Sequence, residues 1–204
     1  MTMTADLSPT DSRLIERALD TATELFTGQD VRDVQMTAIA NQADLDPVMF
    51  RRLFPTKLDL IYALALRVTR ELVAQQRQVC DPEQSPTSQL AQLVRTHIEF
   101  TWHHRTAGRL RRELLPVLRS ISPGRHRELT EQLRDYREHL RTILSRGRAL
   151  GEFCCPHPEI SASSIIDALD GIHNWYDPSA DLSLSQLSDV YVDMVLHHLL
   201  RVPR

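Results

Sequence analysis

The chain has 204 residues, of which 42% are hydrophobic, so it can bury the core of one large domain or of a small module joined to a larger one. Only 5% of the residues are aromatic and only 6 are glycine, which favours helices over sheets. The net charge of −3 excludes a chain that is basic throughout, as many nucleic-acid binders are.

The cellular location is expected to be the cytoplasm. No apolar stretch approaches the roughly 20 residues that a membrane-spanning helix needs, and Met1 to Arg13 is too polar for a signal peptide. The cysteines Cys80, Cys154 and Cys155 are odd in number and lack the spacing of a disulfide framework, which fits a reducing compartment.

The first expected helix covers Ser12 to Thr27, because its apolar residues recur at steps of three and four, and Gly28 is a suitable end. Further along, Thr56 and Asp59 form a capping-box pair that begins a helix extending to about Val79. In all, nine helices are expected, over residues 12–27, 35–42, 46–54, 56–79, 87–104, 108–120, 125–150, 159–176 and 183–200.

Residues 36–57 have the pattern of a helix-turn-helix, in which two short helices meet at Ala43-Asp44-Leu45. Asp44 occupies the sharp turn, where aspartate tolerates left-handed backbone angles better than most residues. Asp46 is a natural N-cap for the second helix, and Pro47 suits its first turn. Three apolar residues are expected to fold back onto Ile39: Leu45, Phe50 and Phe54.

The second helix of such a motif lies in the major groove of DNA, so its outward residues are candidate contacts. Arginines can bind phosphates or guanine edges, and apolar side chains can contact a thymine methyl group. A lysine at the start of the next helix can reach a phosphate. The candidate contacts to double-stranded operator DNA are Gln35, Thr37, Pro47, Val48, Met49, Arg51, Arg52 and Lys57.

Residues 12–67 resemble the N-terminal domain of the TetR family of regulators. The resemblance rests on Leu25-Phe26-Thr27-Gly28, Met36 to Ala40, Ala43-Asp44-Leu45-Asp46, and Arg52-Leu53-Phe54-Pro55-Thr56-Lys57. This sequence departs from the family at Asp44, where the family has glycine, at Gln35 in place of the usual Thr cap, and at Met49 and Arg51, where Thr and Tyr commonly contact phosphate. The resemblance implies an all-α fold, with a DNA-binding domain over residues 1–57 and a ligand-binding and dimerisation domain over residues 58–204.

The C-terminal part is similar to a subgroup of the family that controls lipid, steroid or fatty-acid catabolism. This similarity rests on Asn174-Trp175-Tyr176-Asp177-Pro178 and on residues 182–193. It implies a repressor that a small hydrophobic or acyl-CoA-type effector releases from a palindromic operator, and no cofactor. The candidate ligand contacts are Trp102, His103, Arg105, Arg109 and Trp175.

The charge of the predicted DNA-binding domain differs from that of the segment that carries the two candidate ligand arginines. The first 57 residues carry six basic and nine acidic residues, whereas Arg105 to Arg148 contains 12 arginines and five acids. The arginine-rich segment can supply cations for the phosphates of an acyl-CoA, or it can be a solvated helix face with ordinary surface pairs. Trp102 and Trp175 can line a pocket, or they can belong to the core or to a dimer interface.

The last two helices carry apolar stripes, which either close the core of one chain or form a four-helix bundle in a homodimer. A two-fold dimer is favoured because two DNA-binding domains must meet two half-sites.

Other classes of protein remain as alternatives. No sequence motif of a hydrolase, metalloprotease or phosphate-binding enzyme is present, so we expect no enzyme. Cys154-Cys155-Pro156-His157 admits a metal or redox sensor, although no metal site is predicted there. A helical interaction module that has lost DNA binding, or a regulator that senses a drug-like molecule, is also open.

Overall fold

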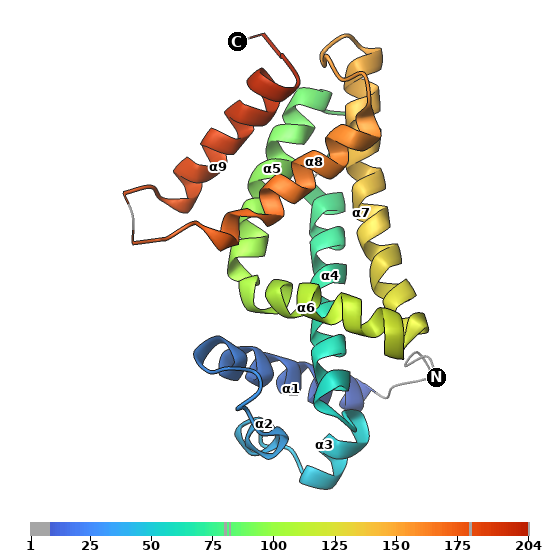
Figure 1. The fold of residues 1–204 in the computed structure, drawn as a ribbon, viewed down its shortest axis with the longest axis vertical. Coiled ribbons are helices and arrows are strands. Elements are labelled where there is room, and N and C mark those ends of the chain that lie inside the picture. Colours follow the sequence, from blue (N-terminus) through green and yellow to red (C-terminus); the bar gives the residue numbers. More distant parts are fainter. Residues whose placement is uncertain (1–8, 80, 82, 180, 204) are drawn as a thin grey trace. The chain divides into compact units, whose positions relative to one another are not determined.

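The computed structural model describes residues 9–79, 81, 83–179 and 181–203, and these residues form nine α-helices and no strand (Figure 1). The predicted all-α fold is therefore confirmed. Of the three cysteines considered in the sequence analysis, Cys80 lies outside the described residues. The helices are α1 (Pro9–Gly28), α2 (Met36–Gln42), α3 (Pro47–Leu53), α4 (Lys57–Val79), α5 (Pro86–His103), α6 (Arg105–Ile121), α7 (Pro123–Ala149), α8 (Pro158–Asp170) and α9 (Leu184–Asp193).

Two predicted helices differ from those in the structure. The helix expected over residues 159–176 ends as α8 at Asp170, and a short 3₁₀ turn over Ile172–Asn174 follows Gly171. Glycine is a poor helix former, so the chain tightens there instead of continuing. The last helix is α-helical only to Asp193 and continues as a π-helical segment over Met194–Leu199.

The contacts between residues divide the chain into two units. The head unit comprises Met1–Arg67 and Thr106–Ser122, and the body unit comprises Val68–Arg105 and Pro123–Arg204. By packing, the division therefore falls within α4, and most of α6 belongs to the head unit. The functional boundary expected after residue 57 stays a prediction.

The head unit is organised around the turn from α2 to α3. Asp44 has a φ of 50°, in the left-handed region that was predicted for it. The guanidinium of Arg17 on α1 donates hydrogen bonds to the carbonyl oxygens of Ala43 and Asp44, the second at 2.8 Å. As predicted, three apolar residues fold back onto Ile39 of α2, and all three are buried with it: Leu45, Phe50 and Phe54.

Helix α4 begins with the predicted capping box. The amide of Thr56 donates to Asp59 Oδ2 at 2.8 Å, and the amide of Asp59 donates to Thr56 Oγ1 at 3.2 Å. Two backbone N–H groups that the helix cannot satisfy are thereby paired, which stabilises the start of α4.

In the body unit, α5 contacts α7, α8 and α9, and its buried face includes Leu90, Leu93 and Ile98. Helix α7 ends before Gly151, whose φ of 75° requires the left-handed conformation that glycine adopts freely. Among the helices that the structure describes, none combines the length and the apolar character needed to cross a bilayer.

Gly147, in the last turn of α7, packs directly against the ring of Phe153. A methyl group placed on it would overlap the ring of Phe153, and both residues are buried. We expect Gly147→Ala to lower the free energy of unfolding by about 1–3 kcal/mol, because either the ring or the backbone must shift. Thermal unfolding followed by circular dichroism measures this change.

Gly124 supplies a matched control, because it lies in the same helix and a methyl group there meets nothing within 4 Å. We expect Gly124→Ala to leave the melting temperature unchanged or to raise it slightly, since alanine is the better helix former. Equal melting temperatures for the two variants would show that the ring of Phe153 moves aside without cost.

Candidate functional site

Helix α3 presents an exposed outer face. Asp46 Oδ2 accepts a hydrogen bond from the amide of Met49 at 2.9 Å, so Asp46 is the N-cap of α3, as predicted, and Pro47 is its first residue. Phe50 faces inward and is buried, whereas Val48 is 79% exposed and Arg51 is also exposed. The helix is therefore held in place by its cap and its buried ring, while polar and apolar groups of its other face remain available to a partner.

A small hollow lies beside this face, between α2 and α3. It has a volume of about 140 Å³ and is lined by Met36, Thr37, Ala40, Pro47, Phe50, Arg51, Phe54 and Pro55. The lining is mostly apolar, and Arg51 is the one charged residue among these described residues. The structure thus brings together Thr37, Pro47 and Arg51, three of the residues predicted to contact DNA.

Two other residues predicted to contact DNA, Lys57 and Arg52, already interact with groups of the protein. The ammonium group of Lys57 donates to the carbonyl oxygens of Val31 at 2.8 Å and Arg32 at 3.1 Å, which leaves one of its three N–H groups. Arg52 Nη2 lies 3.4 Å from Asp11 Oδ1 in an exposed pair.

Two further residues predicted to contact DNA are Gln35, at the start of α2, and Met49, in α3. Gln35 is the N-cap residue of α2, is exposed, and makes no side-chain capping bond. Met49 is half-buried on α3, next to the exposed Val48.

Three of the predicted ligand contacts, Trp102, Arg105 and Trp175, belong to an aromatic cluster in the body unit. The Arg105 guanidinium lies 4.8 Å from the centre of the Trp102 ring, and its Nη1 donates to the Trp102 carbonyl oxygen at 3.1 Å. The Trp102 ring meets Tyr176 edge-on at 4.8 Å. Trp175 is 58% exposed and stacks on Tyr191, with 6.5 Å between the ring centres. An aromatic surface with one stacked cation suits a flat or apolar ligand group.

Two predicted ligand contacts lie apart from this arrangement. His103 Nδ1 donates to the Glu99 carbonyl oxygen at 2.6 Å on the exposed side of α5. Arg109 belongs to the head unit, where it lines a cleft. Spacing along the sequence suggested one arginine cluster, but α6 directs its arginines in several directions, and Arg111 is buried.

A buried polar group in the body unit was missed at the sequence level. His97 is 1% exposed; its Nδ1 lies 2.6 Å from the Tyr136 hydroxyl, and its Nε2 lies 3.3 Å from Asp170 Oδ1. Gln76 is fully buried, and its Oε1 has no hydrogen-bond partner among the described residues. The sequence does indicate that His97 is buried, because it follows Leu90 and Leu93 at helical spacing on the apolar face of α5.

The cysteine loop gives no sign of a metal centre. Cys154 is exposed, whereas Cys155 is buried and its thiol donates to Ser161 Oγ at 3.3 Å. Over the residues described, no three histidine, cysteine or acidic side chains lie close enough to hold a metal ion.

The apolar stripes of the last two helices divide between two faces. Most of their residues close the core of the body unit: Ile165, Ile166, Leu169, Ile172, Val192, Val195 and Leu196. A second set is exposed: Ile160, Val190, Met194 and Leu199. Part of the sequence pattern therefore serves the single chain, and part remains for a partner.

An all-α chain with an exposed α3 after a left-handed turn, joined to a separate helical body unit, has the architecture of the helix-turn-helix regulators. The family profile described as "Tetracyclin repressor-like, C-terminal domain" matches residues 83–199, more than half of the chain, so the protein belongs to the TetR family. Its members are ligand-responsive transcriptional regulators, and the chain is therefore a regulator rather than an enzyme.

Solved structures with the same fold include regulators of this family. A tetR-family regulatory protein from Rhodococcus RHA1 is 19% identical, with a TM-score of 0.82 over 94% of this chain and 99% of that one. The ketosteroid regulator KstR2 of Mycobacterium tuberculosis is 20% identical, with a TM-score of 0.72 over 95% and 96%. AibR, solved with isovaleryl coenzyme A and operator DNA, is 17% identical, with a TM-score of 0.72 over 90% and 98%. No curated protein is significantly similar in sequence.

Burial on α7 gives His139 a measurable pH dependence. Desolvation, and then the charge of Arg77, lower the pKa of His139 below its ordinary value of 6.5. Below that pH the unfolded chain binds the proton more readily than the folded chain, so the fold loses stability as pH falls. We expect His139→Gln to show a smaller drop in melting temperature from about pH 7 to pH 5 than the wild type.

His157→Gln is the control for this measurement, because His157 is exposed at the start of α8. If the two variants melt with the same pH dependence as the wild type, His139 does not resist protonation in the fold.

Proposed function

We propose that this regulator is a cytoplasmic homodimeric repressor that binds a palindromic operator through α3 and is released by a small hydrophobic or acyl-CoA-type effector. The observation that carries the DNA-binding part is the exposed outer face of α3, which its cap, its buried phenylalanine and the left-handed turn hold in one orientation. A recognition helix requires such a fixed scaffold, because base contacts depend on the position of each side chain in the groove.

The groups on this face suit the major groove. Arg51 can bind a guanine edge or a phosphate, and Val48 can contact a thymine methyl group. The hollow beside Arg51, with Thr37 and Pro47 in its wall, has room for such a methyl group. The remaining N–H of Lys57 can donate to a phosphate at the start of α4.

The dimer is proposed to form through α8, α9 and the segment that follows. Ile160, Val190, Met194 and Leu199 expose apolar surface that a second copy of the chain would bury. Two head units in one dimer can then meet two operator half-sites, as two-fold symmetry of the DNA requires.

The effector is proposed to bind in the body unit. The aromatic cluster of Trp102, Tyr176 and Trp175 offers apolar surface, and Arg105 offers a cation for a phosphate. The buried Oε1 of Gln76 needs a donor, which an amide or an amine of an acyl-CoA-type effector can supply. The AibR structure with isovaleryl coenzyme A supports this class of effector for the same fold.

The proposed response to the effector runs through α4. This helix is continuous from Lys57 to Val79 and contributes residues to both units. A displacement of its body part by the effector would move its first turn, change the spacing of the two head units in the dimer, and so weaken operator binding.

The first test concerns DNA. Against a duplex that the protein enriches from a random library, we expect Arg51→Ala and Lys57→Ala each to weaken binding by about tenfold. Each substitution should also reduce the slope of log affinity against log salt by about one, since one phosphate is no longer neutralised. Fluorescence anisotropy at several salt concentrations measures both quantities.

Arg134→Ala, which removes an exposed arginine of α7 in the body unit, is the matched control and should bind as the wild type does. Wild-type affinity for both head variants would exclude the proposed groove face. The Lys57 side chain also holds the loop at Val31 and Arg32. An unchanged melting temperature of Lys57→Ala would show that its weaker DNA binding comes from the lost phosphate contact and not from destabilisation of this loop.

The second test concerns the dimer and its effector. Native mass spectrometry of gently purified protein is expected to show a dimer, and denaturation to release an acyl-CoA or a similar lipid. Because burial of a charge at an apolar interface is costly, Val190→Glu should shift the protein to the monomer.

Val48→Glu adds the same charge on α3 and should leave the dimer intact. A dimer that survives Val190→Glu would place the interface elsewhere, and a different released ligand would exclude the acyl-CoA class.

A further inference from the structure

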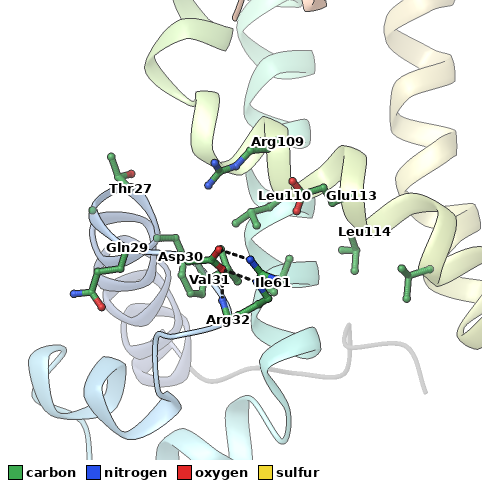
Figure 2. A pocket seen from close by; sticks show the side chains of 13 residues that line it. Thr27, Gln29, Asp30, Val31, Arg32, Ile61, Arg109, Leu110, Glu113 and Leu114 are labelled. Atoms are coloured by element: carbon green, nitrogen blue, oxygen red, sulfur yellow. Dashed lines mark hydrogen bonds and ion pairs between the residues drawn. The ribbon is translucent and has the colours of Figure 1, made fainter. Parts of the chain in front are cut away.

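The head unit contains a cleft that the DNA-binding proposal does not use. It has a volume of about 720 Å³, within the range of small-molecule sites, and it is formed by the end of α1, the loop over residues 29–32, the first turns of α4, and α6. Figure 2 shows the loop residues on one side and the α6 residues on the other.

The floor of the cleft is apolar. Phe26, Leu110 and Leu114 form its floor but are almost fully buried, so the apolar surface open to a ligand comes mainly from the half-buried Ile61 and the exposed Val117. Such a surface favours the apolar body of a ligand, because burying it removes hydrocarbon from water.

The charges on the loop side are already paired. Arg32 donates to Asp30 through its Nε at 3.1 Å and its Nη2 at 2.9 Å (Figure 2). This contact holds the pKa of Asp30 well below its usual range, with a smaller contribution from the charge of Arg109. The loop therefore presents a neutral ion pair rather than a free charge.

The charges on the α6 side interact with the loop pair only at longer range, Arg109 with Asp30 and Glu113 with Arg32. Arg109 and Glu113 both line the cleft, and neither forms a hydrogen bond or an ion pair with any residue that the structure describes. They are four residues apart, so they share one face of α6, with about 6 Å between their Cβ atoms. The cleft thus offers one cation and one anion side by side next to an apolar floor.

We propose that this cleft is a second small-molecule site, separate from the effector site of the body unit, and that it takes an amphoteric molecule with an apolar body. The carboxylate of the ligand binds Arg109, its ammonium group binds Glu113, and its apolar part lies against Ile61 and Val117. A purely anionic ligand would face Glu113 at short range, and a purely cationic one would face Arg109, so charge complementarity selects the ligand that carries both groups. The assignment does not depend on the proposed function.

The site is connected to a predicted DNA contact. Val31 and Arg32 line the cleft, and their carbonyl oxygens accept the hydrogen bonds of Lys57. A ligand that orders this loop therefore also orders the ammonium group at the start of α4, which gives the site a route to influence the head unit.

The test uses three probes that share a phenyl body and differ in charge: L-phenylalanine, 3-phenylpropionate and 2-phenylethylamine. Ligand-observed NMR with the full chain at low ionic strength gives their relative affinities. We expect L-phenylalanine to bind about tenfold more tightly than either singly charged probe, because each of those lacks one charge-assisted hydrogen bond.

Two substitutions should reverse this preference in opposite directions. Arg109→Gln leaves only the anion, so 2-phenylethylamine should become the best probe, whereas Glu113→Gln should favour 3-phenylpropionate. Val117→Trp, which places a large ring at the opening, should abolish binding of all three. Arg119→Gln, an exposed arginine of α6 that does not line the cleft, should bind as the wild type does.

The proposal is overturned if no probe binds, if the singly charged probes bind as well as L-phenylalanine, or if the order of the probes is the same in the wild type and in both glutamine variants. Because none of these measurements contains DNA, their failure leaves the repressor proposal standing, and the failure of operator binding leaves this site standing.

Discussion

The left-handed turn at Asp44 is the constraint on which the head unit depends. A backbone φ of 50° at this residue lets α2 reverse into α3 within a few residues, and Arg17 on α1 donates hydrogen bonds to the carbonyl oxygens of Ala43 and Asp44. The same turn directs Phe50 inward and leaves Val48 exposed. The outer face of α3 is thus a consequence of how the turn is closed.

The head unit joins the features that concern DNA to those that concern a ligand. Lys57 begins α4, and its ammonium group holds the carbonyl oxygens of Val31 and Arg32. These two residues also line the cleft against α6. A single loop therefore lies next to a predicted phosphate contact on one side and to a small-molecule cleft on the other, and the position of α6 within the head unit makes this arrangement possible.

The body unit assigns its residues to different tasks by burial. On the last helices, one set of apolar residues closes the core, while Ile160 and Val190, at 64% and 55% exposure, remain on the surface. Polar groups are also divided, because His97 and Gln76 lie inside, whereas His103 lies outside. This division explains why one apolar stripe in the sequence supports both a stable monomer core and a proposed dimer.

The sequence by itself determined the features that depend on neighbours a few residues away. The N-cap at Asp46, the capping box of Thr56 and Asp59, the turn at Asp44 and most helix bounds follow from local hydrogen bonds and side-chain periodicity, and the structure contains them. Only the tertiary structure decided which distant groups meet. Arg105 stacks on Trp102 while Arg109, four residues later, lines a cleft in the other unit, and Lys57 bonds carbonyl groups 25 and 26 residues away. A helix directs residues to all sides, so the partner of each side chain depends on which helices pack against it, and spacing along one helix cannot specify that.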